Sequence, residues 1–120
     1  MKSNKETVIV CDVDNTLALW SQSHKKPGKN KIKFKDPYTG EFVYLTPHAP
    51  HIRLLKQYKA RGFQVIVWSA AGKAWADTVV DTLGIRKYVD ETMAKPVKFM
   101  DDKNNLEDIL GTRVYLKNDV

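Results

Sequence analysis

The chain has 120 residues, of which 42% are hydrophobic, with one cysteine and a formal net charge of +6. This length and composition predict a single domain over residues 1–120. They exclude an intrachain disulfide and a membrane-spanning helix, since no apolar run approaches the length of a bilayer crossing. The N-terminal residues precede no apolar targeting segment, so we expect a cytoplasmic protein.

Hydrophobic patterns predict strands that alternate with helices along the chain. A continuous apolar run at 7–12 predicts a fully buried strand, and residues 31–45 have the alternation and turn residues of a hairpin. A helix is expected from Thr46 to Ala60, a buried strand over 64–68, and a second helix over 73–83.

Weaker strand signals cover residues 89–93, 97–100 and 113–116, and a short helix is expected from Asn104 to Gly111. This order predicts an α/β fold of three layers, a Rossmann-type parallel sheet with helices on both faces. Residues 21–46 are expected to form a basic β-hairpin flap on this domain.

The positive charge is concentrated in the first half of the chain. Residues 1–60 carry eleven Lys and Arg against five acids, whereas residues 61–120 carry nine of each. Six lysines and no acid lie within residues 24–35. Such a run is usually a solvated loop, and the alternative is an electropositive rim that binds a phosphate-bearing substrate. Charge alone leaves both interpretations open.

Polar side chains follow the predicted strands at the points where the strands end. They are Asp12, Asp14, Thr16, Ser69, Lys95, Asp101 and Asp102. Because parallel strands end at the same edge of a sheet, we expect these side chains to converge on one crevice. Two carboxylates this close need a cation or a shared proton, and carboxylate oxygens suit Mg²⁺. Lysine and hydroxyl groups suit phosphate oxygens.

Each of these residues also has an ordinary structural interpretation. Except for the Asp12/Asp14 pair, each one alone is more often a turn, a helix cap or a surface side chain. Cys11 is interpreted as a small buried thiol. Two further sets are given structural roles only: His24, His48 and His51 at loops or helix starts, and Trp20, Trp68 and Trp75 in the core or at its rim.

In order, the motifs resemble those of the haloacid dehalogenase (HAD) superfamily of phosphatases. The resemblance rests on Asp12-Val13-Asp14-Asn15-Thr16, then Ser69, then Lys95, then Asp101-Asp102, and it covers nearly the whole chain. It implies a phosphomonoester hydrolase in which Asp12 forms an aspartyl-phosphate and Asp14 acts as general acid and base.

The same resemblance implies a Mg²⁺ site and a phosphate site. Asp12, the main-chain carbonyl of Asp14, and Asp101 would hold the ion, with Asp102 assisting directly or through water. Ser69 and Lys95 would bind the phosphoryl oxygens, and Thr16 would orient the nucleophile loop. The chain departs from the family in two ways: no helix separates Lys95 from Asp101, and Asn15 stands where many members have glycine.

Substrate class is the least determined property. The intervals between Asp14 and Ser69 and between Ser69 and Lys95 are too short for a cap domain, so we expect an open, capless site. The C-terminal part resembles polynucleotide 3′-phosphatases, and residues 65–84 resemble carboxy-terminal-domain phosphoprotein phosphatases. Because of the lysine run, a nucleic-acid end or a nucleotide is favoured over a phosphoprotein or a sugar phosphate.

The alternative from another class is a non-catalytic phosphate-binding or phosphoacceptor module. Receiver domains also group acids, a hydroxyl and a lysine around Mg²⁺, but their first-strand acids and their phosphoacceptor lie on different strands. Here the acceptor-like pair Asp12/Asp14 follows the first strand, which disfavours that alternative. The sequence leaves the oligomeric state open.

Overall fold

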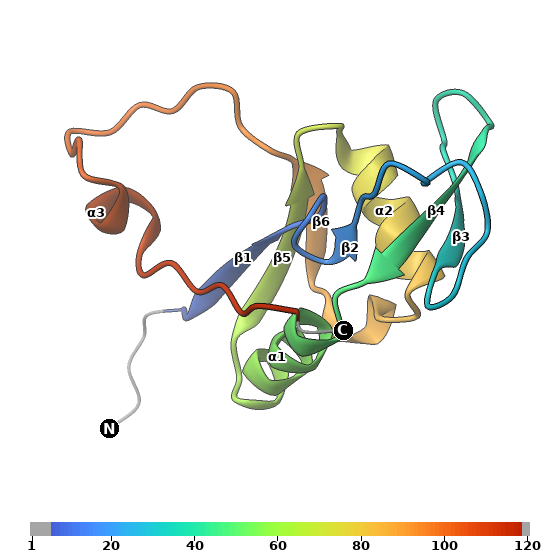
Figure 1. Cartoon of the computed structure of the whole chain (residues 1–120). Coiled ribbons are helices and arrows are strands. Elements are labelled where there is room, and N and C mark those ends of the chain that lie inside the picture. The colour runs from blue at the N-terminus through green and yellow to red at the C-terminus, as the bar shows by residue number, and fades with distance from the viewer. Residues whose placement is uncertain (1–5, 119–120) are drawn as a thin grey trace.

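The computed structural model describes residues 6–118 and contains a three-stranded parallel sheet flanked by helices (Figure 1). The strand order is β1-β5-β6, with β1 at Val8–Asp12, β5 at Gln64–Ser69 and β6 at Glu91–Ala94. Helix α1 (Ala49–Ala60) packs on β5, and α2 (Lys73–Thr82) packs on β5 and β6. The predicted α/β fold without a cap domain is confirmed.

A second sheet is antiparallel and has the order β2-β4-β3. Its strands are β2 at Ala18–Leu19, β3 at Ile32–Lys35 and β4 at Phe42–Pro47. The predicted hairpin is therefore confirmed, and its turn is closed by a bond from Gly40 N to Asp36 O. Phe34 is fully buried against Trp75 of α2, so the hairpin is anchored on the domain rather than loosely attached.

Both predicted long helices form, with small shifts at their ends. Helix α1 begins after its N-cap His48, later than expected, because Pro47 is still paired with Ala18 in the antiparallel sheet. Helix α2 ends as expected, with Gly84 at φ 70°, a conformation that glycine adopts without strain. The one-turn 3₁₀ helix η1 (Arg86–Tyr88) then leads to β6. No helix within residues 6–118 has the length and apolar character needed to span a bilayer.

The two predicted strands at 97–100 and 113–116 are wrong. Residues 95–105 and 111–118 are irregular, and only α3 (Leu106–Leu110), capped by Asn105, forms between them. Figure 1 shows this stretch leaving the sheet after β6 and returning past β1 and α1. Val97 is 96% exposed, because a short apolar run becomes a strand only when it pairs with a strand edge.

Strand β1 is half-buried, which corrects the expectation of a fully buried strand. It pairs with β5 on one side only, and Val8 and Val10 are exposed. A strand is fully buried only when helices cover both of its faces and neighbouring strands pair with both of its edges. Here the other edge of β1 carries no strand within the described part of the chain.

Candidate functional site

The carboxyl edge of the parallel sheet brings together three of the residues singled out in the sequence. Asp12 ends β1 opposite Trp68, so it lies beside Ser69, the last residue of β5. Ser69 in turn pairs with Ala94 at the end of β6, and Lys95 N donates a hydrogen bond of 2.8 Å to Ser69 O. Asp12 is partly exposed, whereas Ser69 is fully buried and its Oγ accepts from Ala71 N at 3.0 Å.

A tight loop after β1 positions Asp14. Val13, Leu17 and Ala18 are fully buried and anchor the loop, and Leu17 N donates to Val13 O at 2.8 Å. Asn15 has φ 62°, in the left-handed region that asparagine tolerates better than most residues. Asn15 therefore adopts a backbone conformation that glycine also adopts without strain.

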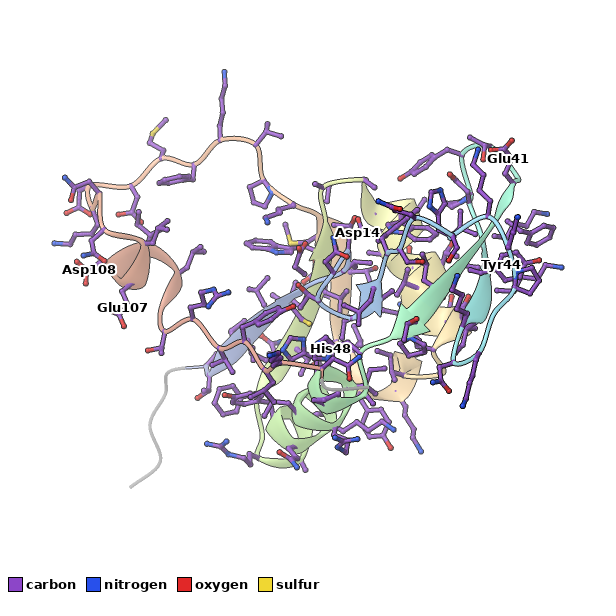
Figure 2. The ribbon with its side chains drawn as sticks, in the orientation of Figure 1. Asp14, Glu41, Tyr44, His48, Glu107 and Asp108 are labelled. Atoms are coloured by element: carbon purple, nitrogen blue, oxygen red, sulfur yellow. The ribbon has the colours of Figure 1, made fainter. Side chains whose placement is uncertain are left out.

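The Asp14 carboxylate (labelled in Figure 2) accepts hydrogen bonds from two tryptophans. Trp20 Nε1 and Trp75 Nε1 lie 2.8 Å and 3.0 Å from the same oxygen, Oδ1. From the sequence, these tryptophans are expected only in the core or at its rim. The available signal was the position of Trp20 close after the Asp12/Asp14 motif, although nothing in the sequence placed Trp75 nearby.

A histidine supports the loop of residues 13–17 that follows β1. The ring of His51 is hydrogen-bonded through Nδ1 to Thr16 O at 2.6 Å, and its Nε2 accepts from Leu116 N at 2.7 Å. This pattern requires a neutral ring with the proton on Nδ1. Thr16 is therefore held through its carbonyl, and the same ring ties the C-terminal stretch to the loop.

His48 and Tyr115 complete this contact. The ring of His48 stacks on His51 with centroids 3.7 Å apart, and Tyr115 Oη donates to Asn15 O at 3.1 Å. Burial, followed by the adjacent His51, lowers the pKa of His48 below its ordinary value. Sequence reasoning missed both histidines as loop supports, although their spacing across the first turn of a helix was visible.

Asp101 and Asp102 do not join the other acids in this structure. Both are exposed on the stretch after β6, where Asp101 Oδ1 accepts from Lys103 N at 2.9 Å and Asp102 pairs with Lys103 at 3.6 Å. Across residues 6–118, no group of three or more His, Cys, Asp and Glu side chains is arranged to hold a metal ion. In Figure 2, α3 and its labelled acids lie well apart from Asp14.

Of the four aspartates expected to hold Mg²⁺, only Asp12 and Asp14 lie at the carboxyl edge of the sheet, where they offer the oxygen ligands that this ion prefers. Asp101 and Asp102 would have to approach them for the expected ligand set to form. The described conformation therefore fits the proposed ion only in part.

A cavity of about 740 Å³ separates β1 from the C-terminal stretch. Cys11, Asp12 and Thr16 line it on one side, and Leu106 and Leu110 of α3 line it on the other. Burial and the neighbouring charge of Asp12 raise the pKa of Cys11 to about 12, so its thiol stays protonated and is a poor nucleophile. The cavity lies along β1 and includes Asp12 among its lining residues.

The basic hairpin borders the site. The space that a Cβ at Gly72 would need, just beyond Ser69, is taken by the hydroxyl of Tyr38 from the hairpin turn. Lys25, Lys26 and Lys29 are exposed and take part in none of the ion pairs found among the described residues. By contrast, Lys31 is fixed by bonds to the carbonyl and hydroxyl of Ser23 at 2.9 and 2.7 Å, and Lys33 lies over the Phe42 ring.

Comparison with known proteins gives a family-level result. A family profile described as NLI interacting factor-like phosphatase matches residues 7–110. The match extends from β1 to α3, and it includes every candidate site residue named above from Asp12 to Asp102. No curated protein matches the chain significantly.

Proposed function

The chain belongs to the NLI interacting factor-like phosphatase family, a HAD-like phosphatase family, and we propose that it is a Mg²⁺-dependent phosphomonoester hydrolase. The observation that carries the proposal is the position of Asp12, a partly exposed carboxylate at the carboxyl end of β1 beside Ser69. A carboxylate in this position is accessible to a phosphate group approaching the sheet edge.

The proposed reaction has two steps that use the chain's own residues. An oxygen of Asp12 attacks phosphorus and forms an aspartyl-phosphate while Asp14 protonates the leaving oxygen. Asp14 then removes a proton from the water that hydrolyses this intermediate. Ser69 and Lys95 bind phosphoryl oxygens, and Thr16 keeps the nucleophile loop in place through its bond to His51.

Mg²⁺, when bound, would neutralise the charge of the phosphate and of Asp12. We propose that Asp12 and the carbonyl of Asp14 hold it, with Asp101 and Asp102 as further ligands. Their participation requires residues 96–102 to change conformation. The exposure of Val97 and Phe99 and the unpaired edge of β1 support such a change, because both leave apolar surface and backbone polar groups in water.

For the substrate we propose a nucleotide or a nucleic-acid end. Three observations support this class: no cap domain is present within residues 6–118, Lys25, Lys26 and Lys29 form no ion pair there, and the hairpin turn contacts Gly72. Lysines bind the phosphate backbone without reading sequence, so binding should depend strongly on salt.

The first test measures phosphate release with and without Mg²⁺, for wild type and Asp12→Asn. The substrate panel contains 3′- and 5′-phosphorylated oligonucleotides, mononucleotides, sugar phosphates and a phosphoserine peptide. Asp108→Asn on α3 is the matched control, because it makes the same change at an exposed site. We expect release that needs both Mg²⁺ and Asp12 and is unaffected in the control. Folded protein that is inactive on the whole panel would favour a non-catalytic phosphate-binding or phosphoacceptor role.

The second test addresses the substrate class. Replacing Lys25, Lys26 and Lys29 by Ser should raise KM for a phosphorylated oligonucleotide and reduce the slope of log(kcat/KM) against log[salt] by about 2. A triple Ser variant at Arg53, Lys56 and Lys87, on α1 and η1, has the same charge change away from the site and should leave the slope unchanged. If both triple variants behave alike, or if the phosphopeptide or a sugar phosphate is the best substrate, the nucleic-acid assignment is wrong.

A further inference from the structure

Asp14 is held by two donors that come from distant parts of the chain. Trp20 follows β2, and Trp75 lies in the first turn of α2, yet both indole N–H groups donate to Oδ1 of Asp14. Oδ2 takes part in no hydrogen bond found among residues 6–118. The two oxygens of this carboxylate therefore differ sharply in their surroundings.

The donors are themselves fixed in place. The main-chain N–H of Trp20 donates to Asn15 Oδ1 at 3.1 Å, and its ring lies edge-on to His24 with centroids 5.1 Å apart. Trp75 is only 4% exposed and packs on Phe34. Because both indoles are held by other contacts, they orient Asp14 before any substrate binds.

We propose that Trp20 and Trp75 are positioning residues that fix Asp14 so that its Oδ2 transfers the proton. This inference rests on the proposed function and assigns the atom that acts in it. An indole N–H can donate but cannot accept, so a proton on Oδ1 would oppose two donors. When Asp14 acts as the acid, Oδ2 therefore carries the proton, and the plane of the carboxyl group determines where it is delivered.

The proton balance follows for both steps. In the first step a bond forms between Asp12 and phosphorus, the bond from phosphorus to the leaving oxygen breaks, and the proton on Oδ2 passes to that oxygen. In the second step the oxygen of water bonds to phosphorus, its proton passes to Oδ2, and the bond from Asp12 to phosphorus breaks. Phosphate leaves, and both carboxyl groups return to their starting states.

The leaving group separates this role from a purely structural one. An alkoxide is a poor leaving group and needs the proton from Asp14, whereas p-nitrophenolate leaves without it. The ratio kcat/KM reports the steps up to departure of the leaving group, so later hydrolysis of the intermediate does not obscure the comparison.

The experiment measures kcat/KM for an alkyl phosphate and for p-nitrophenyl phosphate with Trp20→Phe, which removes the N–H and keeps an aromatic ring. Loss of one hydrogen bond to a carboxylate should lower kcat/KM for the alkyl phosphate about tenfold or more. The value for p-nitrophenyl phosphate should stay close to wild type. Tyr88→Phe is the control, because it changes an aromatic side chain on η1, before the start of β6 and away from the carboxyl edge of the sheet, and it should leave both values unchanged.

Trp20 is 39% exposed, so Trp20→Phe is expected to fold, and its melting temperature checks this. Trp75→Phe serves as the second variant and should show the same selectivity for the leaving group. Equal losses on both substrates, or no loss on either, would overturn the positioning role while leaving the proposed function intact. A folded wild-type protein that hydrolyses neither these two substrates nor any member of the substrate panel above would instead overturn the proposed function, and this inference with it.

Discussion

Residues 8–94 and residues 95–118 of this chain differ in how much regular structure they form and in how far they bury their apolar side chains. In the first region two sheets and two long helices bury a continuous core, and each predicted element forms close to its expected position. In the second region α3 is the one regular element within the described residues, and large apolar side chains such as Val97 and Leu110 lie in water. The second region also carries apolar runs, at 97–100 and 113–116, although their strand signals are weaker than those at 7–12 and 64–68.

The difference shows that an apolar run in the sequence forms a buried strand only where neighbouring strands and helices can pack against it. Val65 and Val67 are buried because β5 lies between two strands and under both long helices. Val97 and Phe99 have no such neighbours, since the edge of β1 is unpaired. Among the described residues, three hydrogen bonds attach the second region to the first one: Lys95 N to Ser69 O directly after β6, Tyr115 to Asn15 O, and Leu116 N to His51.

The largest expected effect on stability comes from comparing one phenylalanine in each region. Phe34 is 0% exposed and Phe99 is 66% exposed. Phe34→Ala should lower the free energy of unfolding by about 3–5 kcal/mol, because it leaves a cavity in the core. Phe99→Ala should change it by less than about 0.5 kcal/mol. Urea denaturation of both variants checks this, and a large loss with Phe99→Ala would show that the second region docks on the domain.

The next effect concerns the junction between the two regions. His51→Ala removes the acceptor of Leu116 N–H and the donor to Thr16 O, which should cost about 1–3 kcal/mol. Hydrogen exchange at the Leu116 amide should also become faster. The control is His24→Ala, made in the basic loop. Unchanged exchange at Leu116 would mean that Tyr115 alone holds the second region in place.

Each region contains an ion pair, and the two pairs should contribute differently to stability. Asp90 accepts from Lys59 Nζ and from Val65 N, both at 2.7 Å, whereas Asp102 meets only Lys103 on an exposed stretch. Asp90→Asn should cost about 1 kcal/mol, and Asp102→Asn should have no measurable effect on stability. Equal effects in thermal denaturation at neutral pH would contradict this.

The pH dependence of Asp90 has a definite sign. The bond to Lys59, followed by the Val65 N–H, lowers the pKa of Asp90 below its ordinary value of 3.8. The contribution of Asp90 is therefore complete above that value and is lost as the pH falls through the lowered pKa. The stability difference between wild type and Asp90→Asn should narrow in acid.

The smallest expected effect comes from His48, at the start of α1. Its pKa is lowered from 6.5, so the unfolded chain binds the proton more readily than the folded protein. The contribution of neutral His48 to the stability of the folded protein should be complete above pH 6.5 and should decrease as the pH falls below that value. His48→Asn keeps an N-cap acceptor and removes the titration, so its stability should depend less on pH in that range. Identical profiles in denaturation at several pH values would contradict this.

Much of the fold could be predicted because its determinants are local. The hairpin follows from alternating residues and a Gly-containing turn, and α2 follows from its apolar spacing and Gly84. The order Asp12, Ser69 and Lys95 along one sheet edge follows from parallel pairing, which fixes where strands end. The strands expected at 97–100 and 113–116 failed because pairing depends on a partner edge that no local pattern specifies.

The sequence by itself determined the α/β class, the order of the elements in residues 8–94 and the motif that indicates a HAD-like phosphatase. Only the tertiary structure decided which side chains surround Asp14 and Thr16, and where Asp101 and Asp102 lie. The physical reason is how far apart along the chain the interacting residues lie. Helix caps, turns and strand alternation depend on neighbours in the chain, whereas the two indole bonds to Asp14 and the imidazole bond to Thr16 depend on how separate elements pack.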